Sequence, residues 1–241
     1  MSKDQDKLYT IAAQVQNYLA YLADQGFTGV DCSAGKLERV FSWGRNPDAI
    51  AAAVKNCRGC PLAGKGGQAI AGAGDQQARI MFVGGWPEPE DAQNDLPFSG
   101  RAGQLLNRMI QAMGFSRDTV YLSFAVKCRP PGDNRPEFRE VMACRRFLES
   151  EIAAVGPEVI CTLGDIALQA LIGENASCEA GRGRFTSFRD TALMPTYSPA
   201  HLLAEPSAKR LTWQDMKQVL DFLGLKPAAG RQGGSAGGKV K

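Results

Sequence analysis

Short apolar runs alternate with helical patterns through the middle and end of the chain, and this alternation constrains the fold more than any other feature. The apolar runs cover residues 79–83, 120–126, 159–163 and 192–196, and helical patterns follow them at 105–113, 137–155, 165–172 and 209–223. Strands joined through helices run parallel, and the helices then cover both faces of their sheet. We therefore expect an α/β protein with three α/β/α layers and a short four-stranded parallel sheet, whose ligands bind outside the carboxyl ends of the strands.

Three parts are expected along the 241 residues. Apolar residues recur at helical spacing within 4–25, so residues 1–55 are interpreted as an N-terminal helical extension. Residues 56–225 contain the alternating pattern and are expected to form the main domain. Residues 226–241 are rich in glycine, alanine, serine and lysine without apolar periodicity, which predicts a disordered tail.

The composition favours a protein that works inside the cell. No leader with an apolar run opens the chain, and no window approaches the ~18 apolar residues that a membrane span needs. We expect a cytoplasmic monomer with no membrane partner. The formal net charge of +3 permits a nucleic-acid partner, although solubility alone explains so small an excess.

The seven cysteines point to metal ligation, because a reducing cytosol disfavours a disulfide framework. Cys57 and Cys60 form a C-x-x-C pair, whose short turn can place two thiolates on one metal. Cys128 and Cys144 are sixteen positions apart, a spacing that suits an iron–sulfur cluster better than a zinc ribbon. The alternatives are a zinc site, or two buried free thiols at Cys128 and Cys144. The other cysteines, Cys32, Cys161 and Cys178, fit ordinary packing.

Four motifs carry a resemblance to a known family. They are Pro-Phe-Ser-Gly-Arg-Ala-Gly-Gln-Leu-Leu at 97–106, Val-Lys-Cys-Arg-Pro-Pro at 126–131, Leu-Gly-Asp-Ile-Ala at 163–167 and Thr-Tyr-Ser-Pro-Ala-His-Leu-Leu at 196–203. With the cysteine spacing, they resemble the family-four uracil-DNA glycosylases, which carry a four-iron cluster. The resemblance implies a [4Fe-4S] cofactor on the four cysteines named above. It also implies a DNA partner, damaged or single-stranded, with RNA as a further possibility, and excision of a flipped base by hydrolysis of its N-glycosidic bond.

Several residues gain expected roles from this resemblance. Phe98 matches the aromatic residue that stacks on the extruded base. The expected base pocket comprises Gly84, Gly85, Trp86, Pro87, Phe98, Phe124 and Ser198. The expected DNA contacts are Arg101, Arg135, His201 and Leu202.

The chain differs from the family pattern at three chemical positions. Gly85 replaces a carboxylate associated with the attacking water, Phe124 replaces an asparagine that reads uracil, and Ser198 replaces a histidine that stabilises the departing base. A phenyl ring cannot donate and accept hydrogen bonds as an amide does. Asp91 and His201, the chain's one histidine, are the substitute catalytic candidates.

These differences leave more than one hypothesis for function. The first is a DNA glycosylase that binds DNA and a flipped base, with altered or weak base excision and little activity on uracil. The second is a catalytically inactive nucleic-acid-binding or partner-binding protein that keeps the glycosylase scaffold and its cluster. A third is an interaction domain held together by zinc.

Overall fold

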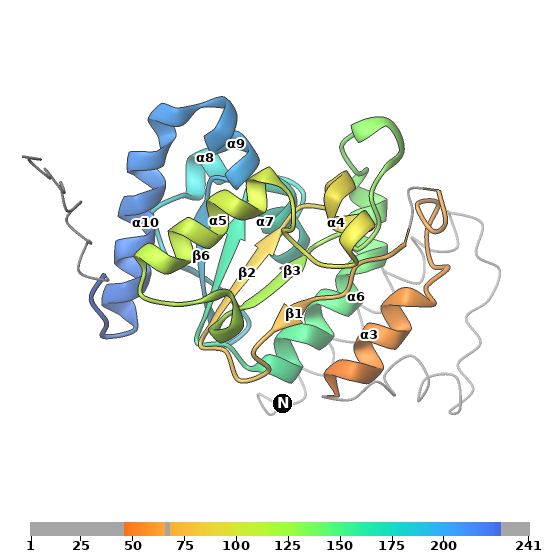
Figure 1. Cartoon of the computed structure of the whole chain (residues 1–241), viewed down its shortest axis with the longest axis horizontal. Helices are drawn as coiled ribbons and strands as arrows, with labels where there is room; N and C mark the ends of the chain where they lie inside the picture. Colours follow the sequence, from red (N-terminus) through yellow and green to blue (C-terminus); the bar gives the residue numbers. More distant parts are fainter. Residues whose placement is uncertain (1–45, 66–67, 228–241) are drawn as a thin grey trace, which may run out of the picture. The chain divides into compact units, whose positions relative to one another are not determined.

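A six-stranded sheet forms the centre of the described part of the chain (Figure 1). The structure, a computed structural model, describes residues 46–65 and 68–227. The strands lie in the order β1-β3-β2-β4-β6-β5. Their bounds are β1 Ala73–Gly74, β2 Ile80–Gly84, β3 Tyr121–Phe124, β4 Val159–Leu163, β5 Thr186–Phe188 and β6 Thr191–Thr196. The central β3, β2, β4 and β6 are parallel, whereas β1 and β5 are antiparallel edge strands.

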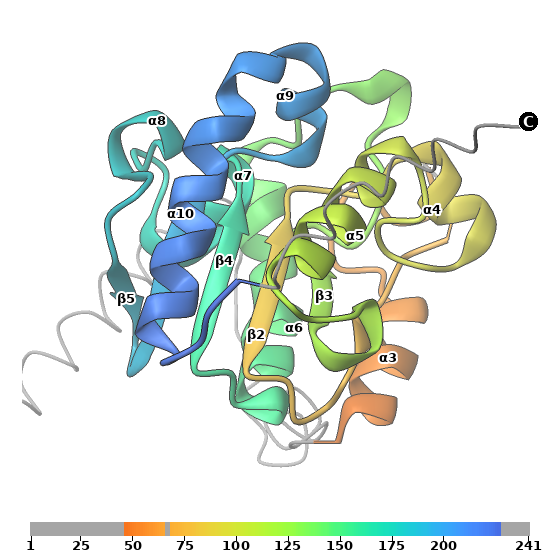
Figure 2. The ribbon, with the colours of Figure 1, turned by 60° about the vertical axis from the view of Figure 1, so that its left-hand side comes forward.

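Helices cover both faces of this sheet, which gives the three layers that the sequence predicts (Figure 2). One face packs against α5 and α10, and the opposite face packs against α3, α6 and α7. The helix bounds are α3 Pro47–Lys55, α4 Pro89–Asn94, α5 Arg101–Ala112, α6 Phe138–Val155, α7 Asp165–Ile172, α8 Cys178–Gly181, α9 Pro199–Ala204 and α10 Lys209–Phe222.

The apolar core is divided between these two faces by the alternation of side chains along each strand. In β2, Ile80 and Phe82 join the cluster beneath α5 and α10, while Met81 and Val83 join the cluster beneath α6 and α7. All four side chains are fully buried. A central parallel strand is covered on both sides, so it appears in the sequence as a continuous apolar run.

The parallel part of the sheet confirms the predicted fold class, whereas the two edge strands were not predicted. The edge strands β1 and β5 have two and three residues, too few to form a recognisable apolar run. The predicted helix within 4–25 lies outside the described residues, as does most of the predicted tail. Helix α3 falls inside the predicted N-terminal extension, and the domain boundaries themselves remain predictions.

The order of the strands determines where a ligand can reach the sheet. The crossover through α5 leads from β2 to β3 on one side, and the crossover through α6 returns the chain to β4 on the other side. The connections after β2 and β4 therefore lead in opposite directions. In folds of this type a crevice opens between two such strands, outside their carboxyl ends. Within the described residues, no helix combines the length and the apolar character needed to cross a membrane.

Leu106 provides a test of this packing. It is fully buried on α5 among the side chains that join this helix to the sheet. Leu106→Ala should lower the free energy of unfolding by about 2–5 kcal/mol, because it removes buried methyl groups and leaves a cavity. Urea denaturation measures this loss, and Gln111→Ala at an exposed position of the same helix is the control. Equal stabilities of the two variants would contradict the packing described here.

Candidate functional site

A pocket of about 500 Å³ lies at the carboxyl ends of β2, β3, β4 and β6. We call it the strand-end pocket. Segments after β2, β4 and β6 and the start of α5 supply most of its lining. The lining residues are Gly84, Gly85, Trp86, Glu88, Pro89, Asp91, Phe98, Ala102, Phe124, Arg135, Leu163, Gly164, Asp165, Ile166, Ser198, Pro199 and Ala200. The predicted pocket residues are brought together here, with the exception of Pro87, which is buried but does not line the pocket.

Two aromatic rings meet at the floor of the strand-end pocket. The ring centroids of Phe98 and Phe124 are 4.6 Å apart and their planes are tilted by 31°. A Cβ atom at Gly84 would lie 2.6 Å from the ring of Phe98 and 2.9 Å from that of Phe124. Both phenylalanines are buried, with 7% and 3% of their surface exposed. One face of the Phe98 ring is therefore already in contact with Phe124.

Phe98 is held in an uncommon backbone conformation. Its φ is 55°, a left-handed value that costs energy for a residue with a bulky side chain. The guanidinium of Arg117 donates to the carbonyl of Phe98 over 3.2 Å and also to the carbonyl of Pro97. Burial lowers the pKa of Arg117, although the nearby Asp91 carboxylate opposes this shift. Arg117 had no expected role, because an arginine beside Ser116 and Asp118 in a turn resembles an ordinary surface residue.

Asp91 links the turn after β2 to the loop that begins the motif at 97–106. One carboxylate oxygen accepts a bond of 2.6 Å from the backbone N–H of Ser99, and the other accepts one of 2.8 Å from the N–H of Glu88. The Ser99 hydroxyl adds a third bond of 3.1 Å. Asp91 is only 1% exposed. The carboxylate of Asp91 therefore holds the backbone of Glu88 and of Ser99 in place. Glu88 also lines the pocket and is half-buried.

Of the other predicted polar residues, Arg135 and Ser198 line the pocket and Arg101 does not. Arg135 is exposed, lines the pocket and donates to Gln169 over 3.0 Å. Ser198 lines the pocket. It is also the N-cap of α9, where its hydroxyl accepts a bond from the backbone N–H of His201. Arg101 is exposed at the start of α5.

His201 and Leu202 lie on α9, and neither lines the strand-end pocket. His201 is exposed and its ring stacks on Tyr197 with centroids 4.7 Å apart. Leu202 is 1% exposed and packs against Leu105, so the prediction that it contacts DNA does not fit its position. Leu203, at 37% exposed, is the leucine of this helix that faces outward.

A second, smaller cavity, which we call the cysteine site, brings the four predicted metal ligands together. Cys57 and Cys60 follow α3, Cys128 follows β3, and Cys144 lies in α6. Across the described residues, no three cysteine, histidine, aspartate or glutamate side chains converge closely enough for a single metal ion. The four sulfurs thus line one cavity.

Several donors are directed at these sulfurs. The backbone N–H of Gly59 donates to the Cys57 sulfur over 3.3 Å, and that of Lys127 donates to the Cys144 sulfur over 3.2 Å. Burial raises the pKa of Cys128 to about 11 and that of Cys144 to about 12, so both thiols prefer their neutral form. Positive charge beside them would favour the thiolates.

The remaining described cysteines match their expected structural role. Cys161 is fully buried in β4 and Cys178 is buried at the start of α8. Cys32 lies outside the described residues.

Comparison with known proteins adds independent information. The profile of the Uracil DNA glycosylase superfamily matches residues 71–217. A type-4 uracil-DNA glycosylase of Saccharolobus solfataricus is 35% identical over 191 residues, which cover 76% of this chain and 88% of that protein. One of Thermotoga maritima is 34% identical over 174 residues, covering 70% and 91%. A type-5 uracil-DNA glycosylase of Pyrobaculum aerophilum is 30% identical over 164 residues, covering 61% and 71%.

Gly103 tests the contact between α5 and the Phe98 loop. A Cβ atom at this position would lie 1.8 Å from the carbonyl oxygen of Phe98. Gly103→Ala should lower the free energy of unfolding by more than about 2 kcal/mol, although alanine normally stabilises a helix relative to glycine. The control is Gln104→Ala at the next, exposed position, and urea unfolding compares the two. A stabilised Gly103→Ala variant would show that the loop and the helix are not in contact.

Proposed function

The chain belongs to the uracil DNA glycosylase superfamily, and on this premise we propose that it binds DNA and a flipped base with altered or weak base excision. The proposed reaction is hydrolysis of the N-glycosidic bond, and the proposed change is a loss of preference for uracil. A base must leave the stack of a duplex before such a site can reach it, and the strand-end pocket is the place that would receive it.

The observation that carries this proposal is the contact between Phe124 and Phe98 inside a retained pocket. Phe124 places a ring without hydrogen-bonding groups at the position where the family that this sequence resembles has an asparagine amide that reads uracil. The pocket has a volume of about 500 Å³ and two aromatic rings in its lining, but at position 124 it lacks that donor and acceptor. A pocket of this kind discriminates between bases by shape and apolar contact more than by the edge of uracil.

Gly85 and Ser198, the other two altered positions, also support weak excision of uracil. A side chain at Gly85 would begin 3.3 Å from the Cβ of Ile166, so Ile166 occupies the space beside this turn. Ser198 uses its hydroxyl to cap α9, and it has no group that could carry positive charge toward a departing base. Removal of one such stabilising group commonly costs about 10²–10³ in rate.

Within the proposed reaction, we divide the acidic roles between two residues. Asp91 positions the loops, because both of its oxygens accept bonds from backbone N–H groups. Among the three carboxylates that line the pocket, Glu88, Asp91 and Asp165, we assign the activation of water to Glu88, a role that requires hydrogen-bond reach of the attacking molecule. His201 receives no catalytic role in this proposal, since it does not line the pocket.

The proposed DNA contacts are Arg135 in the lining of the strand-end pocket and exposed residues of α5 and α9. Arg135 and Arg101 are exposed cations suited to phosphate groups, which attract arginine regardless of base sequence. His201 and Leu203 are exposed on α9 and complete the proposed surface.

We further propose that Cys57, Cys60, Cys128 and Cys144 hold a [4Fe-4S] cluster. The residues fit this group, since four sulfurs line one cavity and two of them accept bonds from backbone N–H groups. When bound, a cluster would link α3, β3 and α6 through metal–sulfur bonds and could accept or donate an electron. Its proposed role here is to stabilise the arrangement of these segments.

The second candidate function is recognition of nucleic acid or of a protein partner without catalysis. The specific observation in its favour is that Phe98 packs against Phe124 and is 7% exposed, which leaves little of its ring for a base to stack on. The glycosylase and the nucleic-acid-binding form of the second candidate differ in base release, not in DNA binding.

The first functional test measures base release from labelled oligonucleotides by the parent chain and by the triple variant Gly85→Glu, Phe124→Asn, Ser198→His. We expect uracil release at least about 100-fold faster from the triple variant, since it restores three groups that each influence the rate. Uracil in single strands and opposite guanine or adenine, hypoxanthine, xanthine and hydroxymethyluracil form the set, with undamaged DNA as control.

The parent chain itself separates the two candidate functions in this experiment. Release of any base establishes the glycosylase, whereas DNA binding without release of any base from the set favours the non-catalytic protein. A folded triple variant that is no faster than the parent on uracil would contradict the roles given to the three positions.

The cluster has its own test. Protein purified without oxygen should contain about four iron atoms per chain and absorb near 400 nm, and Cys60→Ser should lose both signals. Cys178→Ala is the control, because Cys178 is buried away from the four ligands and should leave the iron content unchanged. Stoichiometric zinc in a colourless parent protein would replace the cluster with a zinc site.

A further inference from the structure

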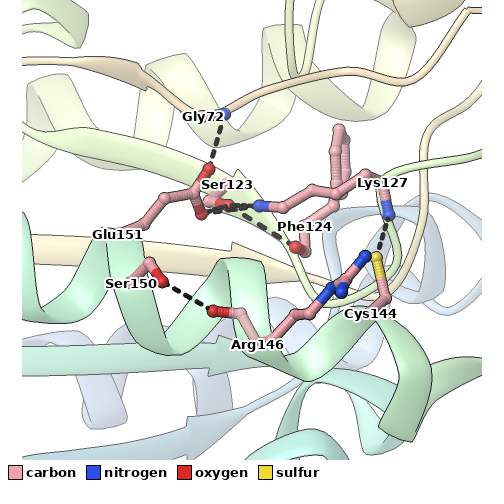
Figure 3. Close-up of polar contacts among 8 residues, drawn as sticks. All are labelled: Gly72, Ser123, Phe124, Lys127, Cys144, Arg146, Ser150 and Glu151. Carbon is pink, nitrogen blue, oxygen red and sulfur yellow. Dashed lines mark hydrogen bonds and ion pairs between the residues drawn. The ribbon is translucent and has the colours of Figure 1, made fainter. Parts of the chain in front are cut away.

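A buried ion pair lies beside the cysteine site and has no part in the function proposed above (Figure 3). The ammonium of Lys127, just after β3, is 2.5 Å from a carboxylate oxygen of Glu151 on α6. Each side chain is 1% exposed. Ser123 of β3 completes the group, because its hydroxyl accepts from Lys127 and donates to Glu151, both over 2.6 Å. We call these three residues the buried triad.

The triad joins three separate segments of the chain. The second oxygen of Glu151 accepts a bond of 2.9 Å from the backbone N–H of Gly72, in the segment that leads into β1. The carboxylate therefore connects α6 to β3 and to this segment at once. A small shift of any of the three segments would break a hydrogen bond in a place that water does not reach.

Lys127 is fixed through its backbone as well as its side chain. Its N–H donates to the Cys144 sulfur over 3.2 Å, and its carbonyl accepts from the N–H of Ile70 over 2.8 Å. All of its polar groups thus contact the protein. Lys127 directly precedes Cys128, so these contacts determine where the Cys128 backbone begins.

Glu151 performs the matching task on the helix. Cys144 and Glu151 are seven residues apart on α6, about two turns, so their side chains project from the same face. Phe147 and Leu148 between them are buried against the sheet. An ion pair at Glu151 therefore prevents α6 from sliding or rotating relative to the end of β3, and it keeps Cys144 in place beside Cys128.

Stability alone does not account for such an arrangement. Removing two charges from water is costly, and a well-packed apolar pair of similar size is often as stable or more stable. In some proteins a buried polar group selects a single register, since another alignment leaves its charges buried without a partner. The triad supplies this specificity where β3 and α6 each contribute one cysteine to the site.

We propose that Lys127, Glu151 and Ser123 are positioning residues that hold Cys128 and Cys144 at the separation required for metal binding. This inference rests on the metal-binding part of the proposed function and is independent of base excision. The triad does not touch the metal, and acts through the backbone of Lys127 and the register of α6.

The test uses the full chain, purified without oxygen, and compares three proteins. They are the parent, the double variant Lys127→Met, Glu151→Leu, and the control double variant Arg79→Met, Glu158→Leu. The control removes an exposed ion pair that directly precedes β2 and β4, at the amino-terminal ends of these strands. For each protein, the thermal midpoint and the rate of iron release to a chelator are measured.

We expect the Lys127 and Glu151 double variant to melt close to the parent and to release iron at least about tenfold faster, the scale on which groups that orient metal ligands affect affinity. The control should match the parent in its release rate. A double variant that is folded and releases iron at the parent rate overturns the proposal. An equal acceleration in the control overturns it too, because the effect would then not be specific to the triad.

Ser123→Ala provides a milder variant, in case the double variant does not fold. It keeps the ion pair and removes one bridging hydroxyl, so iron release should rise roughly threefold, as expected for one hydrogen bond. A parent rate in this variant would contradict the positioning role. If the parent binds zinc, zinc release replaces iron release, and the cluster proposal fails while the positioning role is still measured. A parent that holds neither metal overturns both proposals.

Discussion

The segment that follows β3 is the constraint on which both sites depend. The backbone N–H groups of Ala125 and Val126 donate to the carbonyls of Gly84 and Gly85 over 2.8 and 2.9 Å, which extends the pairing of β3 with β2 beyond the strands themselves. Phe124, just before this pairing, contributes to the floor of the strand-end pocket, and Cys128, just after it, belongs to the cysteine site. Five consecutive residues therefore connect the strand-end pocket with the cysteine site. Because backbone bonds carry the connection, side chains in the pocket can change while the connection itself is retained.

The sequence predicts the centre of the fold well and its edges poorly, for a physical reason. Strands such as β4 are buried on both faces, and this burial requires the apolar run that the sequence displays. Strand β5 has two exposed residues out of three, so pairing with β6 determines its conformation and its own side chains do not. Helix α9 is similarly short, and its start depends on the hydroxyl of Ser198 at its N-cap.

For the candidate site, the sequence predicts which residues gather but not what they contact. The four cysteines and most of the predicted pocket residues lie together as expected, since their motifs follow the strand ends. The outward direction of Leu203 depends on how α9 packs. The bonds of Asp91 combine a capping box with Glu88 and a contact to Ser99 eight residues on, and the motifs alone do not predict this combination. The pairing of Lys127 with Glu151 joins residues 24 positions apart, and a lysine within an apolar stretch gives no sign of its counter-ion.

Arg117 has a consequence for how this protein can be recombined with its relatives. It stands between α5 and β3, yet its guanidinium holds the carbonyls of Pro97 and Phe98, which precede α5. The segments before and after α5 are thereby joined, and the reach of the Arg117 side chain limits the length of the turn between α5 and β3. An insertion or deletion in this turn would move the guanidinium away from the carbonyls and release the strained backbone of Phe98. A chimera should therefore exchange residues 97–124 as one piece, because a crossover point inside it would separate the clamp from the loop that it holds.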